Sequence, residues 1–187
     1  ERHKGSIEGV GVSLPGLVDP STGTALYIPY FLWRDLPISE MISNAVGLPV
    51  VIDNDANAVA LAELWFGRPE VLDARDFILV LVEGGVGTGI VFDGQVYRGE
   101  NGAAGEFGHM TIGQGAPVAC ASGSRECWEA FASERSALAR YKNLTKGGGE
   151  LFDITFGDLI DQALRGEGPA RTALKETANY LGIGIAP

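Results

Sequence analysis

The sequence is poor in cysteine and in basic residues, and each shortage excludes a class of protein. Cys120 and Cys127 are its only cysteines in 187 residues, which are too few for the disulfide framework of a secreted domain of this size. Lysine and arginine number 14 against 24 acidic residues, so the formal net charge is -10. Because this charge repels nucleic-acid phosphates, we do not expect this stretch by itself to bind DNA.

Long apolar runs and a signal peptide are also lacking. No run approaches the length that spans a bilayer, so we expect no membrane segment and a cytoplasmic location. What the sequence does contain is 45% hydrophobic and 20% charged residues. This composition is typical of a soluble globular protein with one sizeable core or two small ones. We find no internal repeat and no low-complexity tract.

The two ends of the chain predict that it is an internal piece of a longer protein. An apolar strand pattern follows the first few residues at once. Near the other end, one buried helix face is predicted by the 4-3-4 spacing of Leu174, Ala178, Leu181 and Ile185. The chain then stops at Pro187, so little sequence follows to cover that face.

Apolar periodicity alternates between strand and helix patterns along the chain. Strands are predicted at 7–14, 50–52, 77–82, 89–92 and 95–97. Helices are predicted at 38–46, 56–66, 126–132, 134–142, 156–165 and 169–186. Loops are expected at 15–37 and 98–126, and Asp93-Gly94 is typical of a hairpin turn. The alternation predicts an α/β fold with a boundary near Gly67, which divides residues 1–67 from residues 68–187.

The first candidate site is Asp53-Asn54-Asp55-Ala56-Asn57, at the junction between a predicted strand and a predicted helix. The carboxyl end of a strand faces the crevice in which α/β proteins bind ligands. There Asp55 can accept a proton from a sugar hydroxyl, and Asn54 can exchange hydrogen bonds with neighbouring hydroxyls. The alternative is that one of these two residues only caps the helix, and the two roles are compatible.

The second candidate site is the glycine-rich string Glu83-Gly84-Gly85-Val86-Gly87-Thr88-Gly89. Glycines such as Gly84, Gly85 and Gly87 allow backbone N–H groups to approach a phosphate closely. A glycine-rich hairpin gives the same string, so that alternative stays open. The string lacks the Lys-Ser/Thr pair of a P-loop and the strand-to-helix context of a dinucleotide site.

The third candidate site combines Gly105-Glu106-Phe107-Gly108-His109 with two cysteines and Glu129 further along the predicted loop and helix. One histidine and two cysteines within nineteen residues of irregular chain indicate zinc. A closed structural zinc site needs four ligands, so the alternative is two buried cysteines beside a loop histidine.

Four segments together resemble the ROK family (repressor, open reading frame, kinase) in order and spacing. They read VGVSLPGLVDPSTG, VIDNDANAVALAELWFG, GGVGTGIVFDGQVYRGENGAAGEFGHM and CASGSRECWEAFAS. The family's glycine signature is matched from Val82 to His109, and the resemblance runs from Ile7 to the end of the chain. It implies an actin-like, hexokinase-like fold of the ribonuclease H type, with a sugar in a cleft between two α/β lobes.

The resemblance assigns roles to individual residues of this sequence. Asp55 matches the catalytic base of the family. The positions that match the sugar site are Gly16, Asn54, Asp55, Glu106, His109 and Glu129.

The resemblance also implies a zinc site formed by His109, Cys120 and Cys127. Where the family has a third cysteine, this sequence has Ser122, and a serine hydroxyl is a much poorer zinc ligand than a thiolate. The loop therefore either binds zinc through an incomplete set or packs without it.

A second departure concerns activity. Kinases of the family have Gly-Thr-Gly where this sequence has Glu83-Gly84-Gly85, so a carboxylate replaces the groups that would meet ATP phosphate. This favours the sugar-sensing effector domain of a NagC-like transcriptional repressor, which binds DNA through an N-terminal helix-turn-helix before Glu1. The alternative is an ATP- and magnesium-dependent hexose or N-acetylhexosamine kinase of the glucokinase type. Either assignment implies a small-molecule sugar as ligand and a homo-oligomer.

Overall fold

A computed structural model of the chain describes residues 7–68, 73–145 and 154–186. These residues form two compact units. The first contains the chain up to Leu79 together with Thr88–Gly105, and the second contains Val80–Gly87 together with the chain from Glu106 onward. These limits differ from the expected boundary near Gly67. The division of the chain into two lobes near Gly67 therefore stays a prediction. The terminal residues 1–4 and 187, which led us to expect a cut chain, lie outside the described residues.

The first unit contains a pair of parallel strands that end side by side. Strand β1 (Val10–Leu14) pairs with β5 (Val50–Asn54), and Leu14 lies opposite Asn54. The carboxyl ends of parallel strands meet at one edge of a sheet. The turn after β1 and the junction after β5 are therefore brought to the same edge.

The prediction of a loop for residues 15–37 is wrong. This segment forms the antiparallel sheet β2 (Leu17–Asp19), β3 (Thr24–Ile28) and β4 (Trp33–Leu36), with the short 3-10 helix η1 (Pro29–Phe31) between the last two strands. The strands are only three to five residues long, too short for a clear periodicity between turn residues. Their inward side chains build most of the core of this unit, whose fully buried members are Val18, Ala25, Ile28, Ile38 and Ile52.

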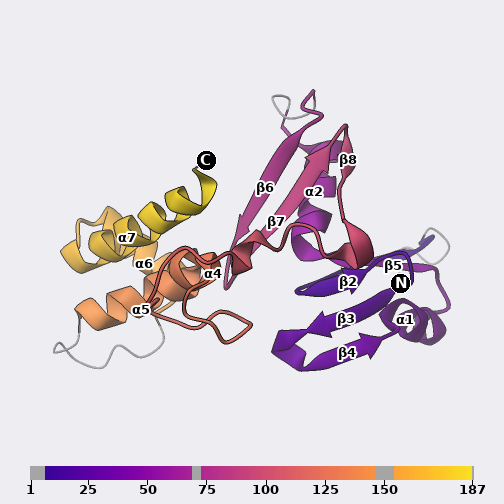
Figure 1. Cartoon of the computed structure of the whole chain (residues 1–187), viewed down its shortest axis with the longest axis horizontal. Coiled ribbons are helices and arrows are strands. Elements are labelled where there is room, and N and C mark those ends of the chain that lie inside the picture. The colour runs from indigo at the N-terminus through magenta and orange to yellow at the C-terminus, as the bar shows by residue number, and fades with distance from the viewer. Residues whose placement is uncertain (1–6, 69–72, 146–153, 187) are drawn as a thin grey trace. The chain divides into compact units, whose positions relative to one another are not determined.

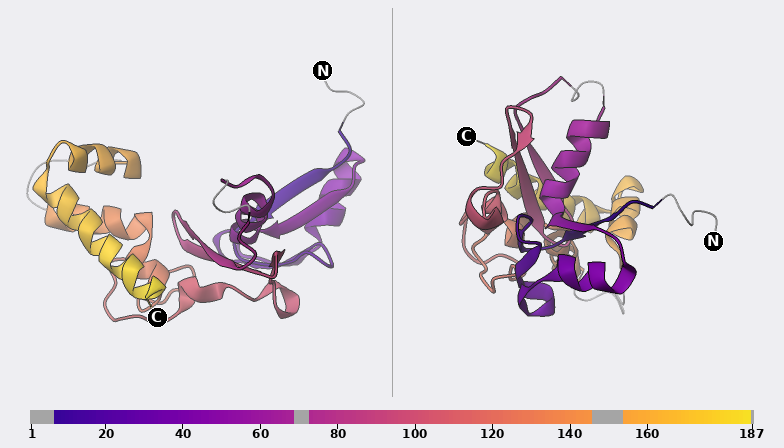
Figure 2. Two further views of the ribbon diagram at one scale, coloured as in Figure 1. Left: turned by 90° about the horizontal axis from the view of Figure 1, so that it is seen from above. Right: turned by 90° about the vertical axis from the view of Figure 1, so that its right-hand side faces the viewer.

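The two predicted helices of the first unit are confirmed. Helix α1 (Ile38–Val46) ends at Gly47, which has the left-handed φ of 70° of a typical C-cap. Helix α2 (Asp55–Phe66) packs against β5 and against β8 (Gln95–Val96). Figures 1 and 2 show α2 directly after β5 and beside the hairpin that β8 completes.

The sheet β6-β7-β8 contains the hairpin that the sequence predicts. Strand β6 (Phe77–Val82) has the predicted bounds, whereas β7 (Val86–Phe92) begins three residues earlier than expected. Asp93 and Gly94 turn the chain from β7 to β8 with φ of 50° and 72°. Positive φ at both central positions defines the hairpin turn that Asp-Gly favours.

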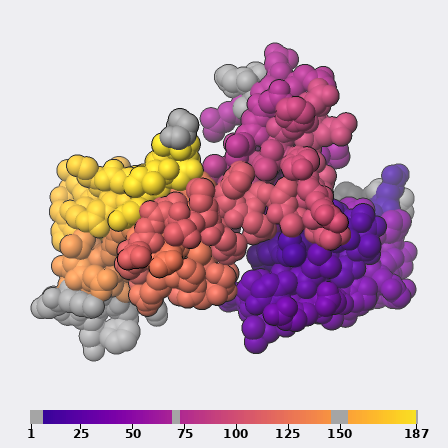
Figure 3. All heavy atoms as spheres, viewed as in Figure 1, coloured from indigo at the N-terminus to yellow at the C-terminus, as the bar shows by residue number. Residues whose placement is uncertain are grey.

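The second unit is a cluster of helices behind an irregular loop. Its helices α4 (Trp128–Ala132), α5 (Glu134–Leu144), α6 (Phe156–Leu164) and α7 (Gly168–Ile185) all lie where they were predicted, within two residues. Helix α7 packs on the other three, and Figure 3 shows these helices in close contact. The loop at 98–126, shared by both units, contains only the short 3-10 helices η2 (Glu100–Gly102) and η3 (Glu106–His109). Among the helices that the structure describes, none is long and apolar enough to cross a membrane.

Candidate functional site

The first unit fixes the junction between β5 and α2 by local hydrogen bonds. The side-chain oxygen of Asn54 accepts a hydrogen bond from the backbone N–H of Asn57 at 3.2 Å, so Asn54 is the N-cap of α2. One carboxylate oxygen of Asp55 accepts from the N–H of Ala56 at 2.8 Å. The capping role is thus confirmed for Asn54. Its role toward a ligand, like that of Asp55, stays a prediction.

The turn at Gly16 lies against this junction. Its carbonyl oxygen accepts a hydrogen bond from the side-chain nitrogen of Asn54 at 3.0 Å. The φ of Gly16 is 98°, and a Cβ at this position would lie 2.6 Å from the carbonyl oxygen of Tyr27. Only glycine fits there without strain. The structure therefore brings together Gly16 and Asn54, which were predicted for one sugar site.

In the second unit, Glu129 from α4 lies against the glycine-rich turn between β6 and β7. Its Oε2 atom accepts a hydrogen bond from the N–H of Val86 at 3.3 Å. A Cβ on Gly85 would lie 2.5 Å from that oxygen, so glycine is what lets the carboxylate approach. The three glycines predicted for a phosphate loop lie in this turn or in the first residues of β7: Gly84, Gly85 and Gly87.

The same carboxylate also holds the cysteine loop. Its Oε1 atom accepts a hydrogen bond from the N–H of Ala121 at 2.9 Å. The Glu129 side chain is therefore a bridge between the glycine-rich turn and the cysteine loop, and it is only 9% exposed. Its predicted contact with a sugar is not tested by these bonds.

The predicted zinc ligands lie together. The ligand atoms of His109, Cys120 and Cys127 are all within 4.8 Å of one another, and both cysteines are buried. The two sulfur atoms are 2.9 Å apart, and the hydroxyl of Ser122 is 3.0 Å from the sulfur of Cys120. In a tetrahedral zinc site two thiolates are about 3.8 Å apart, so a small side-chain rotation would accommodate the ion.

Hydrogen bonding prepares one of these thiols for ionisation. Burial by itself raises the pKa of Cys120. Side-chain hydrogen bonds from Cys127, Ser122 and His109 more than offset that effect and lower the pKa of this thiol to about 7. A thiolate is the form that binds zinc. The donor set therefore fits three strong zinc ligands, with the Ser122 hydroxyl beside the place of the missing fourth.

Glu106 and His109 are close neighbours on η3. The Nε2 atom of His109 lies 3.7 Å from the Oε2 atom of Glu106, and both side chains are more than a third exposed. These two residues and Glu129 belong to the second unit, whereas Gly16, Asn54 and Asp55 belong to the first. The convergence of all six on one sugar stays a prediction.

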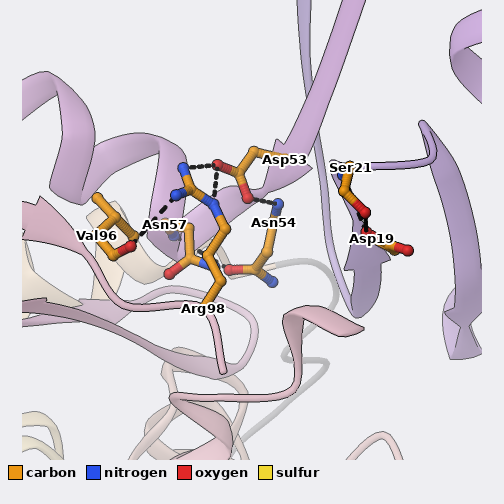
Figure 4. A network of polar contacts seen from close by, with 7 residues as sticks. All are labelled: Asp19, Ser21, Asp53, Asn54, Asn57, Val96 and Arg98. Atoms are coloured by element: carbon orange, nitrogen blue, oxygen red, sulfur yellow. Dashed lines mark hydrogen bonds and ion pairs between the residues drawn. The ribbon is translucent and has the colours of Figure 1, made fainter. Parts of the chain in front are cut away.

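One ion pair beside the junction escaped the analysis of the sequence. The guanidinium of Arg98 binds the carboxylate of Asp53, with its Nη2 atom 2.6 Å and its Nε atom 3.0 Å from Oδ2 (Figure 4). Asp53 stands in the first candidate motif, but its partner is 45 residues away. No local pattern joins two residues at that separation.

Comparison with known proteins places this geometry in a family. The model described as "ROK family" matches residues 1–187. A putative xylose repressor from Caldicellulosiruptor sp. (strain Rt8B.4) is 43% identical over 188 residues, which are 96% of this chain and 46% of the repressor. The chain thus spans less than half the length of that relative.

Two solved structures relate the fold to both activities of the family. A ROK family glucokinase from Streptomyces griseus, in complex with glucose and AMPPNP, matches with a TM-score of 0.86 and 33% identity, over 98% of this chain and 62% of that one. A ROK family transcriptional regulator, a homolog of the E. coli MLC protein, matches with a TM-score of 0.81 and 31% identity, over 95% of this chain and 46% of that one. The expected actin-like, hexokinase-like α/β fold is confirmed by these likenesses, and with its family model matched from end to end the chain belongs to the ROK family.

Proposed function

We propose that this chain is the sugar-binding effector domain of a ROK-family transcriptional regulator and that it does not act as a kinase. The observation that carries the proposal is the acidic character of the turn Glu83–Gly85. The similarity to a xylose repressor and to a regulator of known structure supports the same assignment.

The turn is built in a way that disfavours a nucleotide phosphate. The backbone N–H of Glu134 donates to the carbonyl oxygen of Glu83 at 2.9 Å, so α5 begins directly at this turn. Burial raises the pKa of Glu134, and the negative charge of Glu83 raises it further. Phosphoryl transfer depends on neutralising phosphate charge, and two adjacent carboxylates do the opposite.

Two backbone donors of the turn are already bonded, and the first is the N–H of Glu83, which donates to the carbonyl oxygen of Gly85 at 3.0 Å. The N–H of Val86 already donates to Glu129. A cation beside the turn is Arg135, whose side chain lies near Gly84 and whose Nη2 atom donates to the carbonyl oxygen of Ala119 at 3.4 Å. Arg135 is exposed, and its single positive charge does not neutralise the carboxylates of Glu83 and Glu134.

The junction in the first unit keeps the chemistry that a sugar needs. An asparagine amide offers two N–H donors and two acceptor lone pairs. The Asn54 amide uses one N–H to donate to Gly16 and one lone pair to accept from Asn57. Its second N–H and its second lone pair can therefore bond to a sugar hydroxyl. A carboxylate such as that of Asp55 accepts from several hydroxyls at once. We infer that the ligand is a sugar.

The alternative function is an ATP-dependent hexose or N-acetylhexosamine kinase. The likeness to a glucokinase solved with glucose and AMPPNP favours it, as does the position of Asp55 directly after the end of β5, where a base can act. ATP and magnesium would be ligands only under this alternative. DNA binding through a segment outside this chain, a homo-oligomeric state and a cytoplasmic location remain predictions.

Nucleotide binding by the full-length protein tests the role of the turn. We expect negligible ATP-magnesium binding by calorimetry for the unmodified protein. Glu83→Gly combined with Gly84→Thr restores the residues of the kinases and should produce measurable binding. Glu83→Gln removes only the charge and should also raise ATP binding, whereas its charge-matched control Asp161→Asn, which removes one exposed carboxylate on α6, should have no effect. Tight ATP binding by the unmodified protein, unchanged by Glu83→Gln, would contradict the proposal.

A further inference from the structure

We propose that Arg98 and Asp53 are positioning residues for sugar recognition, which hold Asn54 and Asp55 in the geometry that binds hydroxyls. The proposal rests on the proposed function, because it assumes that a sugar is bound at this junction. It adds Arg98 to the site, and it gives a role to Asp53, which the first candidate motif contains without one. All four residues belong to the first unit.

The pair is oriented by hydrogen bonds at both ends. Two nitrogens of the Arg98 guanidinium share the Oδ2 atom of Asp53, and the third, Nη1, donates to the carbonyl oxygen of Val96 at 3.3 Å. Val96 is the last residue of β8. The guanidinium is therefore anchored to a strand at one side and to the carboxylate at the other, as Figure 4 shows.

The second carboxylate oxygen of Asp53 holds the backbone of the candidate sugar site. Its Oδ1 atom accepts a hydrogen bond from the backbone N–H of Asn54 at 2.9 Å. That peptide is the last of β5, and the next residue is Asp55. If Arg98 is removed, the carboxylate loses its charged partner and is free to rotate toward water. The N–H of Asn54 then loses its acceptor, so the backbone that carries Asn54 and Asp55 is held less firmly.

Burial distinguishes this ion pair from an ordinary surface pair. The side chains of Asp53 and Arg98 are 15% and 31% exposed. In the same unit, Arg75 and Asp93 also form a pair at 2.7 Å, but their side chains are 69% and 75% exposed. Solvent screens exposed pairs almost completely, whereas a half-buried pair keeps more of its interaction. Arg75→Ala is therefore a matched control in which an arginine–aspartate pair is lost far from the junction in sequence.

The test measures sugar affinity and its dependence on single hydroxyls in the full-length protein. The probes are D-xylose, D-glucose, N-acetyl-D-glucosamine and the monodeoxy analogues of whichever sugar binds. We expect Arg98→Ala and Asp53→Asn each to weaken binding about tenfold, which corresponds to about 1.4 kcal/mol of binding free energy. Arg98→Lys keeps the positive charge but loses the two nitrogens that share the carboxylate oxygen. Its sugar affinity should lie between those of the unmodified protein and the Arg98→Ala variant. Arg98→Ala should add no further loss to Asp53→Asn, because both remove the same contact.

The deoxy analogues separate positioning from general stability. The unmodified protein should discriminate strongly against the analogue that lacks the hydroxyl bound by Asp55, and the Arg98 and Asp53 variants should lose that discrimination. An equal loss for all analogues would overturn the positioning role. Unchanged affinity in the variants would overturn this inference alone. If the unmodified protein binds none of the sugars, N-acetyl-D-glucosamine included, the proposed function is overturned as well. If Arg98→Ala does not fold, Asp53→Asn and Arg98→Lys carry the same comparison.

Discussion

Removal of the Glu129 carboxylate should destabilise the second unit even when no sugar is present. The carboxylate accepts hydrogen bonds from two backbone N–H groups, those of Val86 and Ala121. These donors come from segments 35 residues apart in sequence. Glu129→Ala removes this acceptor from both donors, of which Val86 is buried and Ala121 is exposed.

The size of the effect follows from the two distances. A hydrogen bond to a charged group contributes about 1.5–3 kcal/mol to stability. The bond to Ala121 is 2.9 Å long and belongs in the middle of this range, whereas the bond to Val86, at 3.3 Å, belongs at its lower end. We therefore expect Glu129→Ala to lower the free energy of unfolding by about 3–5 kcal/mol. Glu129→Gln keeps one acceptor and should lose about half as much.

Urea unfolding followed by tryptophan fluorescence measures this difference, because Trp128 is the neighbour of Glu129 and is 2% exposed. Glu126→Ala is the control, since Glu126 is exposed and lies only three residues earlier. A surface change of this kind costs less than about 0.5 kcal/mol. If the Glu129→Ala and Glu126→Ala variants unfold at the same urea concentration, the bridging role of the carboxylate is wrong.

Three other predictions follow from the geometry. Gly16→Ala should lower the free energy of unfolding by about 1–3 kcal/mol because of its positive φ, whereas Gly11→Ala, with no atom near its Cβ position, should lower it much less in thermal melts. Asp55→Ala should weaken sugar binding by about 1.5–3 kcal/mol in calorimetry, since a hydroxyl loses its charged acceptor; full affinity would exclude this contact. In metal analysis of the purified protein, Cys127→Ala should lower the zinc content and Ser122→Cys should raise it, and equal zinc in all three proteins would count against the metal site.

The parts of the fold that were predictable from sequence are those with strong local signals. Helix α6 begins with a reciprocal capping box between Thr155 and Asp158, which the sequence pattern indicates directly. The hairpin at Asp93-Gly94 needs only two residues with positive φ. In contrast, β2, β3 and β4 are short strands that exist because they pair with one another, and pairing between separate segments leaves no periodic trace in the sequence.

In the candidate site, too, some features were predictable from the sequence and others were not. The place between a strand and a helix predicts an N-cap at Asn54 or Asp55, and the structure shows that it is Asn54. The approach of Gly16 to Asn54 depends on the parallel pairing of β1 with β5, which the sequence motifs do not reveal individually. The ion pair of Arg98 with Asp53 depends on the position of β8 beside α2. Contacts between residues far apart in the chain become visible only in three dimensions.

The most direct test of the account is to measure sugar binding and ADP release on one preparation of the full-length protein. The protein is incubated with ATP, magnesium and, in turn, D-xylose, D-glucose and N-acetyl-D-glucosamine. We predict that at least one sugar binds and that none of them stimulates ADP release above the sugar-free rate. Sugar-dependent ADP release at the rates of ordinary kinases, about 1–100 per second, would contradict the assignment as a sensor.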